Sequence, residues 1–438
     1  MGRLTNEEKA RRAAEAQANA GLGPLGAIPK LNPACTTRTS SPPKSESPSR
    51  TRDQAQSVEN PFKLNAVKFH HMALCTPPVR GYDMTQLRQE GLTIPKAVEE
   101  LYNKLKATPV GGIPLQLKDK FVDDANTPRK SREVPQESEY TTEDVPLPLT
   151  AEKLRDFKER VDFFVDEAQY NMATDAYERQ WGHTIAGFLR EFTIWSYEHG
   201  QRCRVRNIEN CSIAPFEIRP VIVGGIAIRL GDGDESASVS TSNTASSRLK
   251  TTAITKMIDW TVGLVLSRED MGIIEDWYRK CLNHPLWASL SQSNSYRDAL
   301  CIDIEIKRVA DPDPRVQLSV WAQAGFNKRL AHGWDFTMPA PAIVIDQHIW
   351  TGYLFFGVPG DPQDPEDQGS LIMLGPMHFG TTADNRGIWQ IIQKVHVLMT
   401  WAGTDYRKWF DENVIKTAKL ATRPYVEEDS SRAGEHSG

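Results

Sequence analysis

A short stretch near the middle of the chain constrains the fold more than any other feature. In residues 301–307, CIDIEIK, isoleucines alternate with charged residues: Ile302, Ile304 and Ile306 against Asp303, Glu305 and Lys307. Successive side chains of a strand point to opposite faces, so this pattern predicts a strand with one apolar and one charged face. We expect the apolar face to pack on a core layer, and the charged face to be a candidate site.

Helical patterns on both sides of this strand indicate the fold class. Two helical stretches are expected between about residues 150 and 199, and in the second a buried stripe falls at helical spacing: Trp181, Ile185, Phe188, Phe192 and Trp195. Further strands are expected over 341–348 and 349–358, and a long amphipathic helix from about Asn385 to Val414. Strands flanked by helices predict an α/β fold with a central mixed sheet.

The chain divides by composition into four parts. Residues 1–64 are rich in Ala, Pro, Ser, Arg and Lys and are expected to form a disordered arm, whose mild basic character is typical of a solvated tail. Residues 65–147 form an N-terminal extension and linker, with a short helix opened by Pro95 and a polar linker from about 121. The main domain covers 148–416, and 417–438 is a disordered tail. A Ser-rich loop over about 232–248 is expected to be disordered as well.

Bulk properties limit the function classes. The 438 residues carry a net charge of -5, which argues against a protein that coats nucleic acid by bulk electrostatics, although an enzyme needs only a locally positive groove. The sequence lacks a long apolar run and an apolar N-terminal segment, so we expect neither membrane insertion nor secretion. The six cysteines form no CxxC pair. An intracellular protein, nuclear or cytoplasmic, fits these features best.

Two strands carry the residues that could perform chemistry. Glu305 and Lys307 lie two residues apart on one strand face, about 7 Å along the strand, close enough to share a water held by a metal ion. The stretch around Asp259 shows the same alternation, with Ile258, Trp260, Val262 and Leu264 expected on the apolar face. A solvated strand face with a Glu and Lys pair would show the same local pattern. Glu178, one turn before Trp181, could supply a third carboxylate.

A series of motifs resembles a PD-(D/E)XK nuclease-like family found widely in fungi. The motifs are Glu178-Arg179-Gln180-Trp181, Ile258-Asp259-Trp260, Ile304-Glu305-Ile306-Lys307, Gln317-Leu318-Ser319-Val320-Trp321, Trp401-Ala402 and Trp409-Phe410. The likeness covers roughly residues 70–415. It implies a restriction-endonuclease-like core and a magnesium-dependent nuclease site. Two departures are Ile258 where the family usually has Pro, and a gap of about 45 residues before Glu305, filled by a helical insertion.

Two functional hypotheses follow. The first is a nuclease that uses Mg²⁺ or Mn²⁺ to hydrolyse phosphodiester bonds of DNA or RNA, with Asp259, Glu305 and Lys307 as catalytic residues. Asp259, Glu305 and Glu178 would bind the metal, and Gln317 would support the site. The second keeps the fold without the chemistry, as a nucleic-acid-binding or protein-interaction module. No GxSxG, Walker A or GxGxxG motif stands between a strand and a helix, which disfavours esterase and nucleotide-binding functions.

Overall fold

The computed structural model describes residues 69–108, 112–126, 134–141, 151–198, 202–209, 211, 213, 221–222, 252–253, 258–280, 299–307, 313–360, 363 and 369–422. The chain divides into two units, Met1–Glu59 and Asn60–Gly438, and all described residues belong to the second. The expectations of disorder for residues 1–64 and 232–248 lie outside the described residues, as does the part of the expected tail from 423 to 438. Residues 417–422 of that tail are instead helical, in α11 (Lys416–Thr422), where Ala418 is buried.

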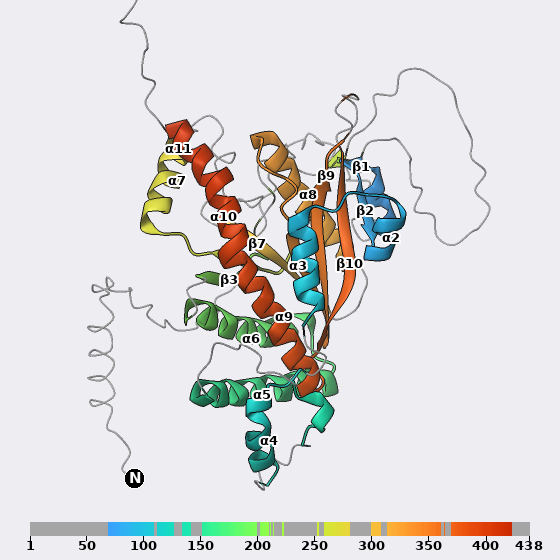
Figure 1. The fold of residues 1–438 in the computed structure, drawn as a ribbon, viewed down its shortest axis with the longest axis vertical. Coiled ribbons are helices and arrows are strands. Elements are labelled where there is room, and N and C mark those ends of the chain that lie inside the picture. Colours follow the sequence, from blue (N-terminus) through green and yellow to red (C-terminus); the bar gives the residue numbers. More distant parts are fainter. Residues whose placement is uncertain are drawn as a thin grey trace, which may run out of the picture. The chain divides into compact units, whose positions relative to one another are not determined.

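A mixed sheet of seven strands forms the centre of the second unit (Figure 1). Its order is β2-β10-β9-β8-β7-β6-β3, and two of the pairings, β2 with β10 and β7 with β8, are parallel. The strands are β2 (Val79–Tyr82), β3 (Cys203–Asn207), β6 (Trp260–Leu264), β7 (Ala299–Lys307), β8 (Ala340–Asp346), β9 (Ile349–Val358) and β10 (Ser370–Thr381). A separate small antiparallel sheet consists of β1 (Cys75–Thr76), β4 (Val221–Ile222) and β5 (Thr252–Ala253).

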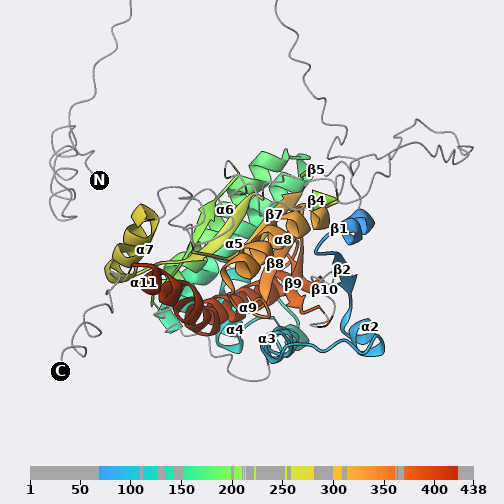
Figure 2. The same ribbon diagram turned by 90° about the horizontal axis from the view of Figure 1, so that it is seen from above.

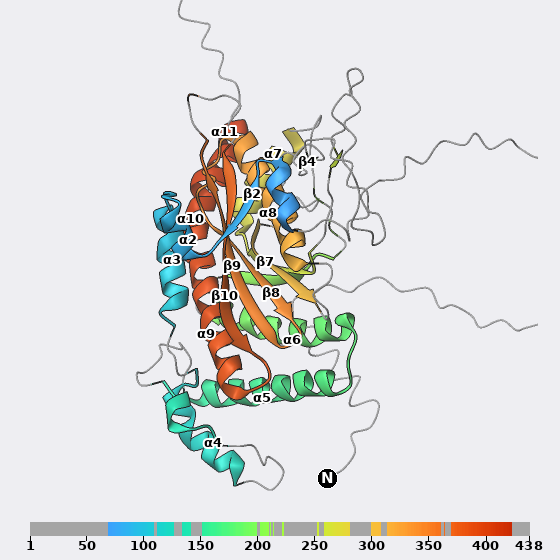
Figure 3. The same cartoon turned by 90° about the vertical axis from the view of Figure 1, so that its right-hand side faces the viewer.

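Helices cover both faces of the large sheet, as the sequence predicts. They are α2 (Met84–Gln89), α3 (Lys96–Lys106), α4 (Lys118–Ala125), α5 (Ala151–Ala173), α6 (Glu178–Glu198), α7 (Arg268–Lys280), α8 (Pro314–His332) and α9 (Asn385–Trp401). After α9 the helix continues through two π-helical turns into α10 (Arg407–Phe410) and α11 (Lys416–Thr422). In Figure 3, α3 and α9 lie on one side of β8 to β10 and α8 lies on the other. Among the described helices, none combines the length and apolar character that crossing a membrane requires.

Two hydrophobic clusters correspond to these two faces. The larger contains Ile302, Ile304 and Ile306 of β7 with the buried sides of α6 and α9. The smaller contains Val344 of β8 and the apolar residues of α8, among them Val320. The alternation in residues 301–307 therefore predicts correctly that Ile302, Ile304 and Ile306 enter the larger core, which also contains Cys301. Figure 2 shows the molecule from above, with α8 next to β7 and β8.

Part of the stretch from 121 to 147, expected to be a linker, is ordered and packed. Helix α4 runs to Ala125, and Phe121 and Tyr140 are buried with their rings 6.3 Å apart. Ile113 and Tyr140 form an isolated parallel bridge. The stretch reads as a linker because most of its residues are polar, and the apolar residues that are buried in its described part, such as Phe121 and Tyr140, are few. By contrast, α3 follows Pro95 and buries Val98, as its spacing predicts.

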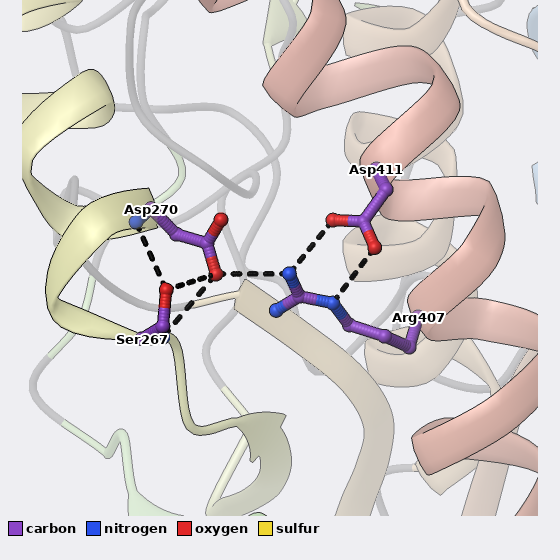
Figure 4. Close-up of polar contacts among 4 residues, drawn as sticks. All are labelled: Ser267, Asp270, Arg407 and Asp411. Carbon is purple, nitrogen blue, oxygen red and sulfur yellow. Dashed lines mark hydrogen bonds and ion pairs between the residues drawn. The ribbon is translucent and has the colours of Figure 1, made fainter.

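The helical insertion before β7 is attached to the C-terminal helix by a polar network (Figure 4). Ser267 and Asp270 cap the start of α7, since the Asp270 amide donates to Ser267 Oγ and the Ser267 amide to Asp270 Oδ2. The same Asp270 Oδ2 accepts a 2.8 Å hydrogen bond from Arg407 Nη2. Arg407 also pairs with Asp411 one turn further along the helix. The network fixes α7 beside α10.

Candidate active site

Glu305 and Lys307 lie together on the face of β7 that α8 covers. Glu305 is 0 % exposed and Lys307 is 7 % exposed. Lys307 Nζ is 2.7 Å from Glu305 Oε1, so the two charges form a buried ion pair. Burial of two charges is costly unless each is compensated by a close partner. The two residues therefore form a site in which charge is concentrated away from bulk water.

Asp259 joins this pair through the backbone of β7. Its Oδ2 accepts a 2.7 Å hydrogen bond from the amide of Ile306, the residue between Glu305 and Lys307. The carbonyl of Asp259 in turn accepts from the amide of Ile208, 3.0 Å away, which fixes the position of the residue in the chain. The structure thus brings together the three residues that the sequence singles out, although they are far apart along the chain.

The placement of Asp259 differs from the sequence-based expectation in one respect. Asp259 was expected within a strand, opposite an apolar face that includes Ile258. The structure begins β6 at Trp260, so Asp259 immediately precedes it. Ile258 packs in the smaller cluster beside α8, whereas Trp260, Val262 and Leu264 pack in the larger one. The regular alternation ends at this point, which allows the Asp259 carboxylate to reach the β7 backbone.

The start of α6 approaches the same end of the sheet. The ring of Trp181, in the first turn, lies 5.9 Å from the ring of His348 in an edge-on arrangement. Gln347 and His348 follow the end of β8, and the amide of Gln347 donates to the carbonyl of Lys307. The backbone of Glu178 at the first position of α6 is therefore near the end of β7 that carries Lys307. The Glu178 side chain lies outside the described part of the structure.

Gln317 occupies the first turn of α8, which follows β7 after a short connection. Its side chain is 9 % exposed. A buried amide in the helix that covers the Glu305 face is suitably placed for a supporting role. That role stays a prediction.

Two further carboxylates lie on the same sheet face. Asp303 is 7 % exposed and accepts a long hydrogen bond from Thr261, 3.5 Å away; burial raises its pKa to about 7. Asp346 is paired in register with Lys307 on the neighbouring parallel strand, and burial raises its pKa also. The sequence analysis missed Asp346. It ends the apolar run of β8, and a carboxylate at the end of a buried strand is the signal that would have identified it.

The donor chemistry of the site fits a hard divalent cation that keeps several water ligands. Carboxylate oxygens are the ligands that Mg²⁺ prefers, and one or two of them suffice when water and substrate complete its shell. Asp259 and Glu305 supply two carboxylates around the Ile306 amide. In the part of the chain that the structure describes, no group of three or more His, Cys, Asp or Glu residues is close enough to hold a metal ion. Glu178, whose side chain lies outside the described part of the structure, stays the predicted third carboxylate.

A cleft of about 760 Å³ lies elsewhere, between α5 and α6, and Phe163, Phe164 and His183 are among the residues that line it. Asp259, Glu305 and Lys307 do not line it. Its charged lining residues are mainly acidic (Asp156, Glu159, Glu167 and Glu191 against Arg160), which is unfavourable for a phosphate ester. We therefore place the candidate active site at β6 and β7.

Comparison with known proteins agrees with this geometry. The family model of the PD-(D/E)XK nuclease superfamily matches residues 119–407, a range that includes Asp259, Glu305 and Lys307. The comparisons with curated proteins and with solved structures give no match. The mixed sheet flanked by helices is consistent with the restriction-endonuclease-like core of that superfamily. With most of the chain matched and the acidic and Glu-x-Lys elements in place, the chain belongs to the PD-(D/E)XK nuclease superfamily.

Proposed function

We propose that the protein is a metal-dependent nuclease that hydrolyses phosphodiester bonds of DNA or RNA at Asp259, Glu305 and Lys307. The observation that carries the proposal is the hydrogen bond from the Ile306 amide to Asp259, because it joins the separate acidic residue to the Glu-x-Lys strand. Charges gathered on a largely buried surface cost free energy, and active sites are places where such a cost is typically retained.

In this proposal each residue has a separate role. Asp259 and Glu305 would hold Mg²⁺ or Mn²⁺, with Glu178 as a third carboxylate acting through a water. When bound, the ion supplies positive charge to the phosphate and lowers the pKa of a water molecule. Lys307 donates a hydrogen bond that orients the attacking water, and its charge stabilises the phosphate as negative charge develops. The Ile306 amide holds Asp259 in position, and Gln317 supports the site.

The reaction needs no covalent intermediate with the protein. The water oxygen forms a bond to phosphorus and gives up a proton to solvent, while the bond to one ester oxygen breaks and that oxygen takes up a proton from solvent. Lys307 would act on the charged phosphate, and a bound cation would add positive charge there. Their combined effect is electrostatic stabilisation, which is typically the largest contribution to such catalysis.

A cleavage assay tests the proposal. Wild-type protein and Lys307→Ala are incubated with labelled single- and double-stranded DNA and RNA, each with Mg²⁺, Mn²⁺ or EDTA. We expect cleavage that requires the cation and that falls at least about a hundredfold in the variant. Lys106→Ala, at an exposed position on α3, is the matched control and should cleave as wild type does.

Two outcomes would contradict the nuclease. Equal cleavage by Lys307→Ala and wild type would place the activity elsewhere in the chain. Binding of nucleic acid without cleavage of any substrate would favour the alternative, a silent nuclease fold that acts as a binding or interaction module.

A further inference from the structure

The strand at one edge of the large sheet carries a row of arginines. Arg204 and Arg206 lie in β3 and Arg202 directly precedes it, and all three are exposed. They alternate with Cys203, which is buried, and Val205, which is partly buried. Residues two apart in a strand share one face, so Arg204 and Arg206 project to the same side of the sheet, about 7 Å apart. Arg202 stands just outside the regular strand, with a φ of 47°, and lines a cleft with Gly403 and Arg407.

The face on which they lie is that of the candidate active site. Arg206 is paired in register with Thr261, and Thr261 with Asp303. The Thr261 hydroxyl donates to the Asp303 carboxylate, so these side chains lie on one face. On the opposite face, Cys203 Sγ donates to the carbonyl of Met399 in α9. Arg204 and Arg206 therefore lie on the sheet face that carries Glu305.

The row begins beside the site and runs away from it. Ile208, two residues after Arg206, donates its amide to the carbonyl of Asp259. Arg206 is thus about 7 Å along the strand from the position next to Asp259, and Arg202 is about 20 Å from it. Neighbouring strands are about 4.8 Å apart, so two strand spacings separate the row from β7. These distances correspond to several nucleotides at about 3.4 Å of rise each.

Two acidic residues lie at the ends of the row. Asp270 lines a cleft of about 290 Å³ with Arg202 and Arg407, and its carboxylate accepts hydrogen bonds from Arg407 and Ser267. Glu209 is exposed beyond the end of β3 that is nearest to Asp259. The chain as a whole has a net charge of -5, so three arginines within residues 202–206 are a local exception to its charge.

We propose that Arg202, Arg204 and Arg206 bind successive backbone phosphates of a nucleic-acid strand on one side of the bond to be cut. The proposal rests on the nuclease function proposed above and adds where the substrate lies. Contacts of this kind position a strand without reading its sequence. Edge-strand charges also discourage pairing between sheets of different molecules. If the arginines served only to prevent such pairing, removing them would cause self-association without loss of nucleic-acid binding.

The test measures binding without cleavage. Fluorescently labelled duplex DNA, single-stranded DNA and RNA are titrated with full-length protein in EDTA at several salt concentrations. The triple variant Arg202→Gln, Arg204→Gln, Arg206→Gln should bind about tenfold or more weakly at moderate salt. Its slope of log affinity against log salt should be shallower by about 2 to 3. The corresponding triple Arg→Lys variant keeps the charge and should keep most of the slope.

A control of equal charge separates a local effect from a general one. Lys106, Arg155 and Arg190 are exposed on α3, α5 and α6, and their triple Gln variant should bind as wild type does. Matching melting temperatures and gel-filtration profiles verify the fold and the oligomeric state of each variant. A slope for the β3 variant equal to that of the control would overturn the proposal, as would wild-type protein that binds none of the three probes.

The same experiment distinguishes this inference from the nuclease function. Arginine-dependent binding by a protein that never cleaves would support the phosphate track and contradict the nuclease. Metal-dependent cleavage together with binding that the β3 variant does not weaken would support the nuclease function and contradict the phosphate track.

Discussion

Glu305 and Lys307 share one face of β7 but should respond differently to mutation. Glu305 would be a direct oxygen ligand of the metal, so Glu305→Ala should lose both metal binding and cleavage. Lys307 would act on water and phosphate, so Lys307→Ala should lose cleavage while binding Mg²⁺ or Mn²⁺ about as tightly as wild type. Removing a cation 2.7 Å from the Glu305 carboxylate should, if anything, tighten metal binding. Isothermal titration calorimetry with each variant measures this difference.

Fold damage is the main alternative explanation for a loss in either variant. Each substitution leaves one buried charge without its partner, so both variants should be less stable than wild type in EDTA, where metal binding makes no contribution. Circular dichroism should nevertheless show both variants folded at the assay temperature. Loss of metal affinity in folded Lys307→Ala would contradict the assigned roles.

Lys328 gives a prediction about pH that is independent of the metal site. It is 1 % exposed in α8, and burial lowers its pKa to about 7. Between about pH 7 and 10.5 the unfolded chain holds this proton more firmly than the folded protein, so stability should rise with pH across that range. Lys328→Met removes the charge, so its free energy of unfolding at pH 7 should exceed that of wild type by up to about 4 kcal/mol.

Urea unfolding at pH 7 and pH 9.5 measures the Lys328 effect. The difference between variant and wild type should shrink at the higher pH, because other titrating groups contribute equally to both proteins. A difference that is the same at both pH values would mean that the folded protein does not shift the pKa of Lys328.

Single residues show how far the sequence alone can predict this site. Alternation in CIDIEIK predicts which face Glu305 and Lys307 share, because facing is a local property of a strand. The hydrogen bond between Asp259 and the Ile306 amide joins segments far apart in the chain. Nothing in the local sequence indicates that Asp259 lies just before the strand rather than within it. The arginine row escaped the sequence analysis for a related reason. Exposed alternate arginines become a candidate binding surface only when the pairing of β3 with β6 shows their face.

At the scale of helices, a buried ion cluster joins α4 to α5. Lys158 of α5 is 0 % exposed, and its Nζ lies 2.5 Å from Asp124 of α4 and 2.7 Å from Asp162. Lys158→Ala would leave two carboxylates buried without this cation, so we expect the free energy of unfolding to fall by about 3 to 5 kcal/mol. Hydrogen exchange should show faster opening of α4 in particular, because the cluster connects it to α5.

Lys120→Ala is the matched control for Lys158. Lys120 also pairs with Asp124, at 3.3 Å, but its side chain is 22 % exposed. A partly solvated pair contributes about 1 kcal/mol or less. Equal effects of the two substitutions would show that burial does not determine the strength of the cluster.

Elements were predicted unevenly, and the reason is the range of the interactions that form them. Helices with an apolar stripe, such as α6, follow from local periodicity. The parallel pairing of β2 with β10 joins residues 79–82 to residues 371–374, and nothing in either short segment specifies its partner. Helix α4 was missed because its polar sequence is stabilised by the buried cluster with Lys158, which only the fold brings together.

At the scale of the whole molecule, net charge proved a poor guide to local function. The value of -5 was an argument against nucleic-acid binding by bulk electrostatics. It is compatible with a positive row on one edge strand, because screening limits each charge to about 10 Å at moderate salt. The charge that a substrate meets is the local one, so the distribution over the sheet face matters more than the sum.

The N-terminal segment provides a test of the predicted domain organisation. Every buried residue of the two hydrophobic clusters lies at Met72 or later, and so do Asp259, Glu305 and Lys307. The chain also divides into separate units after Glu59. Deleting residues 1–64 should therefore change the melting temperature by no more than about 2 °C, which corresponds to less than 1 kcal/mol for a domain of this size. Metal affinity should be unchanged, and nucleic-acid affinity should keep the salt slope that depends on Arg202, Arg204 and Arg206.

Scanning calorimetry, metal titration and the binding assay, each with the full-length protein as reference, measure these three effects of the deletion. A large fall in melting temperature would mean that the segment packs on the core, whereas a lost salt slope at unchanged stability would move the phosphate contacts from β3 to the basic arm.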